Sequence, residues 1–123
     1  MSTSAEPWLH VEDAGGITIL RFRASELRDH GVVQAVADEM SRAAAGSIRL
    51  LLDFSLVNEI SSSMLAKLID ENKRFQAKGG HMVLYSLRPA VYDLLAVTQS
   101  NRLFTVCPDH NAALASLAGP SKT

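Results

Sequence analysis

The stretch that decides the fold spans residues 50–97 and reads LLLDFSLVNEISSSMLAKLIDENKRFQAKGGHMVLYSLRPAVYDLLAV. It opens with an apolar run, residues 50–54, that only Asp53 interrupts. Such a run is typical of a central strand that is covered on both faces. A serine triplet, residues 61–63, follows a short polar connection, and apolar residues then recur at helical spacing. We therefore predict a buried strand that leads into an amphipathic helix over about residues 62–77.

The sequence after this helix continues the alternation of helices and strands. Residues 79–80 are a glycine pair, which suits the left-handed turn that ends a helix, and the apolar residues 82–85 predict another buried strand. Pro89 fits the first turn of a further helix because that position needs no N–H. Residues 103–106 predict a short last strand, and Asp109 is the expected cap of a terminal helix.

The sequence before residue 50 predicts two strands and one helix. Residues 8–13 and 17–22 are expected to form a hairpin that turns at residues 14–16, Ala-Gly-Gly. Residues 32–44 carry apolar side chains at nearly helical spacing, and Gly46 is a suitable terminator. The whole pattern predicts an α/β fold with a mixed β-sheet of about four to five strands and about four helices packed mostly against it.

Length and composition indicate one soluble domain. A chain of 123 residues can build a single core that buries roughly two-thirds of its unfolded surface. We expect this domain to span residues 8–117, with flexible termini at residues 1–7 and 118–123. A formal net charge of -1 gives no electrostatic argument for a nucleic-acid partner.

The sequence also indicates a cytoplasmic location. No apolar run approaches the ~20 residues that span a bilayer, and the N-terminus lacks a signal-peptide pattern, so we expect no membrane insertion. The single cysteine, Cys107, cannot form an internal disulfide, which fits a reducing compartment.

The order of these landmarks resembles the STAS domain family, the anti-sigma factor antagonists of bacteria. Members are similar in having a hydrophobic strand that ends in Leu-Asp, an Asp-Ser-Ser-Gly-Leu motif that opens a helix, a Gly-Gly before the next strand, and a Pro-led helix after it. The likeness covers roughly residues 8–117. The matching segments of this chain are Leu50-Leu51-Leu52-Asp53, Ser61-Ser62-Ser63-Met64-Leu65, Gly79-Gly80 and Arg88-Pro89-Ala90-Val91.

The resemblance implies a non-enzymatic, partner-switching function in transcription regulation. By position in the motif, the phosphorylated serine falls on Ser62, with Ser61 and Ser63 as alternative acceptors. The implied partner is an anti-sigma factor, an ATP-dependent serine kinase, that binds the unphosphorylated form and releases it once Ser62 is modified. A phosphatase and other STAS proteins are further implied partners. Two motif positions differ, because Ser61 replaces the aspartate and Met64 replaces the glycine.

The helix start and the nearby loop are the expected partner-binding surface. Asp53 lies near the same end of the sheet and is a candidate for orienting the serine. Asp70 and Arg74 are candidates on the exposed side of the helix, where solvated charge is the alternative. Two alternatives remain open: Ser62 could be only a helix cap, and Glu59 could be only a solvated loop residue. The residues assigned to this surface are Asn58, Glu59, Ser61, Ser62, Ser63, Met64 and Lys67.

The sequence carries no pattern of catalysis, metal binding or cofactor binding. A Gly-x-Ser-x-Gly elbow and a phosphate-binding glycine-rich loop are missing, and Cys107 precedes a proline as an inert thiol at a strand end. The histidines fall in separate predicted elements without ligand spacing. They are His10, His30, His81 and His110.

Two other functions compete with the phospho-switch. The first is a constitutive scaffold or an accessory subunit of a signalling or transport assembly, which Met64 favours because a bulky residue there could obstruct a kinase. The second is a small-molecule-binding module, for which the sequence offers no ligand-specific residue set.

Overall fold

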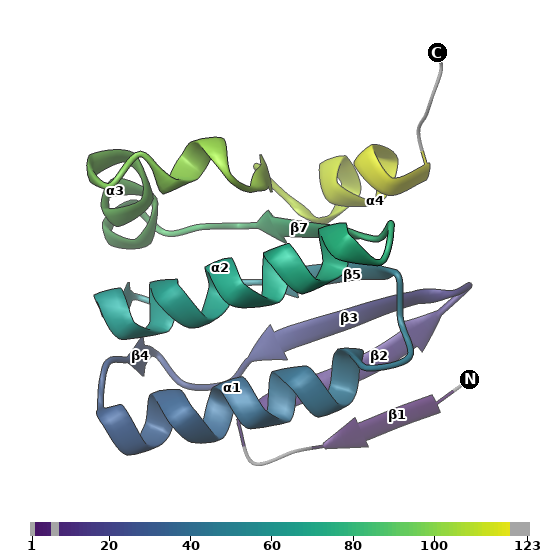
Figure 1. Ribbon diagram of the computed structural model, residues 1–123, viewed down its shortest axis with the longest axis horizontal. Coiled ribbons are helices and arrows are strands. Elements are labelled where there is room, and N and C mark those ends of the chain that lie inside the picture. The colour runs from purple at the N-terminus through teal and green to yellow at the C-terminus, as the bar shows by residue number, and fades with distance from the viewer. Residues whose placement is uncertain (1, 6–7, 119–123) are drawn as a thin grey trace.

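A computed structural model of the chain describes residues 2–5 and 8–118 and shows a six-stranded sheet with helices on both faces (Figure 1). A second sheet has two strands, β4 (Glu26–Leu27) and β6 (Glu59–Ile60). The helices are α1 (His30–Ala44), α2 (Ser62–Ala77), α3 (Pro89–Val97) and α4 (His110–Ala118), with a 3-10 turn, η1, at Ser100–Arg102. The main sheet contains β1 (Ser2–Ala5), β2 (Leu9–Ala14), β3 (Ile17–Phe22), β5 (Arg49–Asp53), β7 (His81–Tyr85) and β8 (Thr105–Cys107).

The main sheet is mixed, and its strand order is β1-β2-β3-β5-β7-β8. Strands β1, β2 and β3 are antiparallel neighbours, whereas β3, β5, β7 and β8 run parallel. The parallel part follows from the connections, because a helix lies between each successive pair of these strands and returns the chain to the same end of the sheet. The α/β fold with a mixed sheet and four helices within the described residues is therefore confirmed.

The sheet has more strands than the sequence predicted. Residues 2–5 lie in the segment that we expected to be a flexible terminus, but they form β1 and pair with β2 in register Ser2↔Asp13 to Ala5↔His10. The physical reason is tertiary, since this short polar segment has no apolar alternation of its own and gains its backbone hydrogen bonds from β2. Residue 118, also expected in a flexible terminus, is the last residue of α4, and the remaining residues of the expected termini, 1, 6–7 and 119–123, lie outside the described residues.

The alternation of side chains along β5 divides the core into two clusters. Leu50 and Leu52 point to the face that α1, α2 and α3 cover, and Leu51 points to the opposite face, where Ala113 of α4 is buried. All three leucines are fully buried, as expected for a strand with both faces covered. No helix in the described ranges is long and apolar enough to cross a bilayer.

The glycine pair after α2 has the predicted role. Gly79 adopts φ +76°, a left-handed conformation that favours glycine. Gly80 lies so close to the neighbouring chain that a Cβ there would approach the carbonyl oxygen of Ile48 to 2.7 Å. This turn ends α2 at Ala77, and the helix occupies the range that the sequence predicted.

Candidate functional site

Ser61 builds the start of α2. Its Oγ accepts a hydrogen bond from the backbone N–H of Met64 at 3.1 Å, and its backbone is extended, which is N-cap geometry. Its own N–H donates to the carbonyl oxygen of Leu27 at 3.0 Å, so the β4–β6 pairing fixes the residue before the helix begins. The alternative that Ser62 is only a helix cap is therefore wrong, because Ser61 is the cap.

Ser62 and Ser63 are the first two residues of α2, and both are exposed. Neither hydroxyl makes a hydrogen bond with another part of the chain that the structure describes. The helix start thus offers two exposed serine hydroxyls beside the capping serine.

Met64 points into the core, where it is 0% exposed. It packs in the large cluster that also contains Leu65 and Leu68 of the same helix. We assigned Met64 to the partner-binding surface, and the structure overturns that assignment because its side chain contributes no surface. The bulky residue at the motif's glycine position therefore does not obstruct access to Ser62.

Asp53 holds the loop that leads to the serines rather than the serines themselves. Its carboxylate accepts hydrogen bonds from the backbone N–H of Ser55 at 2.9 Å and from Arg21 Nε at 3.1 Å. The same loop is held from the other side, since Arg88 Nε donates to the carbonyl oxygen of Ser55 at 2.9 Å. Burial alone would raise the pKa of Asp53, but the hydrogen bonds from Ser55 and Arg21 outweigh it and lower the pKa below its ordinary value.

Glu59 and Asn58 are both fixed by the segment around β4. Glu59 Oε1 lies 2.5 Å from Arg28 Nη1, in an exposed ion pair that crosses from β6 to the end of β4. The alternative that Glu59 is only a solvated loop residue is therefore wrong. The backbone N–H of Asn58 donates to the carbonyl oxygen of Ser25 at 2.6 Å, and its side chain is exposed. The exposed Arg28–Glu59 ion pair contributes about 0–1 kcal/mol to stability, so it shapes the surface more than it stabilises the fold.

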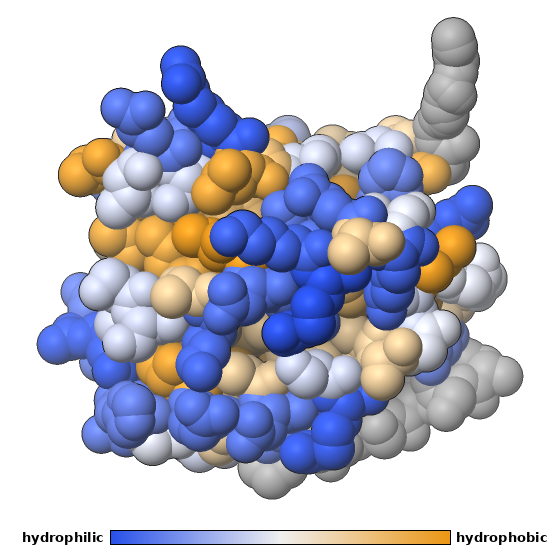
Figure 2. Space-filling view, in the orientation of Figure 1, coloured by the Kyte–Doolittle hydropathy of each residue, from blue (hydrophilic) through white to orange (hydrophobic). Residues whose placement is uncertain are grey.

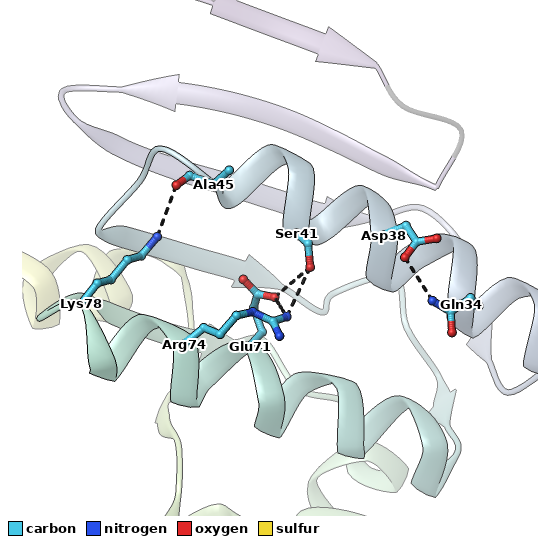
Figure 3. Close-up of polar contacts among 7 residues, drawn as sticks. All are labelled: Gln34, Asp38, Ser41, Ala45, Glu71, Arg74 and Lys78. Atoms are coloured by element: carbon cyan, nitrogen blue, oxygen red, sulfur yellow. Dashed lines mark hydrogen bonds and ion pairs between the residues drawn. The ribbon is translucent and has the colours of Figure 1, made fainter.

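The exposed side of α2 is less available to a partner than its sequence suggests. Arg74 forms an ion pair with Glu71, which is only 4% exposed, and it also contacts Ser41 of α1 (Figure 3). Because Arg74 neutralises a buried carboxylate, its charge is engaged within the fold. Lys67 and Asp70, together with Arg74, line a polar hollow of about 210 Å³ between α1 and α2.

An apolar hollow of about 390 Å³ lies beside the helix start, between α3 and β6. Figure 2 shows hydrophobic surface gathered between α3 and α2, at the left of the view. This hollow was not predicted from the sequence, although the nine residues of α3, PAVYDLLAV, are apolar on almost every side. We call it the α3 hollow, and it is lined by Arg28, Glu59, Ile60, Ser61, Ala90, Asp93, Leu94 and Val97.

A polar contact between Tyr85 and His110 lies on the face of the sheet that α4 covers. Tyr85 of β7 is paired with Asp53 of β5, and its hydroxyl lies 2.8 Å from His110 Nδ1 of α4. Burial, and then the neighbouring Asp53 carboxylate, raise the pKa of Tyr85 to about 12. The tyrosine therefore stays neutral and helps attach α4 to the sheet. Within the described residues, no three His, Cys, Asp or Glu side chains converge as a metal site requires.

Together, the mixed sheet and the exposed helix start define a small α/β domain that presents two serine hydroxyls at the first turn of α2. A sequence model of the STAS domain matches residues 9–113. The chain belongs to the STAS domain family. A comparison with curated proteins finds no match.

Solved structures share this fold at low sequence identity. An anti-sigma factor antagonist from Mycobacterium paratuberculosis has a TM-score of 0.80 and 20% identity, with 96% of each chain covered. A STAS domain protein from Planctomyces limnophilus has a TM-score of 0.79 and 24% identity, with 89% of this chain and 96% of that chain covered. The Bacillus cell fate determinant SpoIIAA in its phosphorylated form has a TM-score of 0.66 and 15% identity, covering 88% of this chain and 98% of that chain.

Proposed function

We propose that this protein is an anti-sigma factor antagonist that acts as a non-enzymatic partner switch in the bacterial cytoplasm. A serine kinase that also serves as the anti-sigma factor binds the unphosphorylated form, and phosphorylation of Ser62 releases it. The observation that carries the proposal is the division of roles at the helix start, where Ser61 caps α2 and leaves the Ser62 hydroxyl exposed. Family membership and the likeness to structures described as antagonists support it.

Ser62 is a better acceptor than its two neighbours. The Ser61 oxygen is engaged in the cap and half-buried, so its modification would cost the helix about 1 kcal/mol of capping stabilisation. Ser63 is exposed like Ser62, and the family motif is what favours Ser62 over it.

The substitution of the motif's aspartate by Ser61 preserves the local structure. Serine and aspartate are both strong N-cap residues, because each offers an oxygen to an N–H of the first helical turn. Ser61 makes this bond to Met64. The difference is one of charge, since the neutral cap leaves no carboxylate beside the acceptor serine.

A phosphate on Ser62 would act mainly at the interface. It would add about -1.5 to -2 charge to a neutral surface position, and a partner that packs there would have to dehydrate it or withdraw. The fold itself would tolerate the phosphate, because a helix N-terminus stabilises an anion by about 0.3–1 kcal/mol. The apolar α3 hollow beside Ser61 should increase the loss of binding, because burying a phosphate dianion next to a dry contact costs free energy.

Phosphosite mapping tests the proposal. Native extract with ATP is incubated with the wild-type protein, Ser62→Ala and the matched control Ser63→Ala, and each sample is analysed by intact mass and peptide fragmentation. We expect one phosphate on the wild-type protein and on Ser63→Ala, and none on Ser62→Ala. Phosphate that stays on Ser62→Ala assigns another acceptor and contradicts the role of Ser62.

A further inference from the structure

Helix α3 is apolar on more sides than the core covers. Of its nine residues, only Val91 and Leu95 are buried. Val97 at its end is 80% exposed, and Tyr92 is 44% exposed. Exposed apolar side chains that gather around a concavity mark interaction sites more often than solitary ones do.

The α3 hollow has a largely apolar lining and is large enough to bind a side chain. Ile60, Ala90, Leu94 and Val97 supply its apolar lining, and its volume of about 390 Å³ falls within the range of about 300–1,000 Å³ that is typical of ligand pockets. It is therefore large enough to receive a large apolar side chain from another molecule.

The charges at the rim leave one carboxylate available. Arg28 and Glu59 neutralise each other across 2.5 Å. Asp93 also lines the hollow, and it makes no hydrogen bond or ion pair with the rest of the chain that the structure describes. The complementary partner surface therefore carries a cation, Lys or Arg, beside its apolar anchor.

The hollow is continuous with the proposed phosphorylation site. Ser61 lines it and Ser62 is the next residue, so a protein that binds at Ser62 reaches the edge of the hollow. We infer that the α3 hollow is the anchor point of the kinase that modifies Ser62. The kinase inserts a large apolar side chain between Leu94 and Val97 and places a Lys or Arg against Asp93. This inference rests on the proposed function.

The apolar anchor also explains how phosphorylation could release the kinase. A buried apolar side chain contributes most to binding when the contact around it excludes water. A phosphate at Ser62 keeps its own hydration water at the edge of the contact, so the apolar anchor can no longer be enclosed in a dry interface. The same surface therefore supports tight binding before modification and poor binding after it.

The first test determines the chemistry of the occupant without needing the kinase. Random twelve-residue peptides are displayed against Ser62→Ala protein, and the selected peptides are titrated against Val97→Asp and the matched control Tyr92→Asp. We expect peptides that combine a large apolar residue with Lys or Arg. Their affinity should fall tenfold or more for Val97→Asp and stay within twofold for Tyr92→Asp, which lies on the same helix outside the hollow.

Two further measurements complete the peptide test. In Asp93→Asn the preference for the basic peptide residue should disappear while the apolar preference remains. Circular dichroism and thermal unfolding confirm that each variant is folded. Peptides without this residue pair, peptides that bind Val97→Asp as well as wild type, or a dimer of this chain that Val97→Asp dissolves would each overturn the inference.

The second test identifies the occupant as the kinase. The purified kinase that phosphorylates Ser62 is assayed with wild type, Val97→Asp and Tyr92→Asp, and its KM and kcat are separated. The anchor predicts a KM at least tenfold higher for Val97→Asp with little change in kcat. An unchanged KM would show that the kinase does not use the hollow, even though Ser62 remained its substrate. Conversely, peptide binding at the hollow without any Ser62 phosphorylation would contradict the proposed function, and with it the kinase as occupant, but would leave the hollow as a docking site for an apolar residue and a cation.

Discussion

The Ser61 Oγ accepts the Met64 backbone N–H at 3.1 Å, so the first serine of the triplet is structural and the second is free. This hydrogen bond separates capping from reactivity within two adjacent residues. In the turn that follows, Met64 enters the core while Ser62 and Ser63 face solvent.

Removing the two hydroxyls one at a time should separate these roles. Ser61→Ala is expected to lower the free energy of unfolding by about 1 kcal/mol because it removes the cap. Ser62→Ala should change it by less than about 0.5 kcal/mol, as is usual for a surface side chain without partners. Urea unfolding measures both, with Ser61→Asp as a control that keeps a capping oxygen. An equal cost for both alanine variants would refute the assignment of the cap.

Restoring the family's glycine at position 64 should destabilise this protein. Met64→Gly removes a fully buried side chain, for which truncation to alanine alone costs about 2–5 kcal/mol, and it adds the lower helix propensity of glycine. We expect the free energy of unfolding to fall by at least about 3 kcal/mol. Ser63→Gly, one residue earlier and exposed, is the matched control and should cost about 1 kcal/mol or less. A small effect of Met64→Gly would mean that Met64 is not part of the core.

The buried side of the α2 ion pair should be sensitive to loss of its partner. Arg74→Ala leaves the Glu71 carboxylate buried with only the Ser41 hydroxyl as a side-chain donor. A hydrogen bond to a charged group contributes about 1.5–3 kcal/mol, so we expect a loss of that size in chemical unfolding. Lys73→Ala, an exposed cation on the same helix, should be close to neutral. If both variants behave alike, Arg74 is only a surface charge.

Acid should weaken the fold through Asp53. Its pKa is lowered in the folded state, so the unfolded chain takes up the proton first as the pH falls. The contribution of Asp53 to stability is therefore present above about pH 4, the ordinary range of an aspartate, and is lost as the pH falls through the folded-state pKa. In Asp53→Asn, the free energy of unfolding should depend less steeply on pH below about pH 4. A slope equal to that of wild type would contradict this role.

Alkali should act through Tyr85 with the opposite sign. Its pKa is raised to about 12, so the unfolded chain loses the phenolic proton first as the pH rises above the ordinary value near 10. The stability that Tyr85 contributes is present below about pH 10 and is lost as the pH rises toward 12. The free energies of unfolding of wild type and Tyr85→Phe should therefore converge as the pH rises through this window. A constant difference between them would show that Tyr85 ionises freely in the folded protein.

Much of this fold follows from local signals in the sequence. The range of α2 was predicted because apolar spacing, a serine cluster and a glycine pair agree on its two ends. Asp109 caps α4 as predicted, with its carboxylate accepting the Ala112 N–H at 2.9 Å. Strands β4 and β6 were missed because segments of two residues are too short to show a period, and only their mutual pairing defines them.

The site was harder to predict for the same reason. The spacing of Ser61, Ser62 and Ser63 identifies a helix start, but three similar residues in succession do not show which one is the cap. That choice depends on the pairing of Ser61 with Leu27, which is distant in sequence. The α3 hollow also depends on how α3 lies against β6, although the unusually apolar sequence of α3 was a usable signal.

Release of the kinase by phosphorylation of Ser62 is tested by measuring how much of each partner protein is recovered from native extract. The immobilised proteins are wild type, Ser62→Ala, Ser62→Asp and the matched charge control Ser63→Asp. A phospho-switch at Ser62 predicts that the wild-type protein and Ser62→Ala recover an ATP-binding serine kinase. Ser62→Asp should recover at least tenfold less, and Ser63→Asp should recover more than Ser62→Asp. Equal recovery of the same partners by all four proteins would contradict the switch and indicate a constitutive scaffold or accessory subunit.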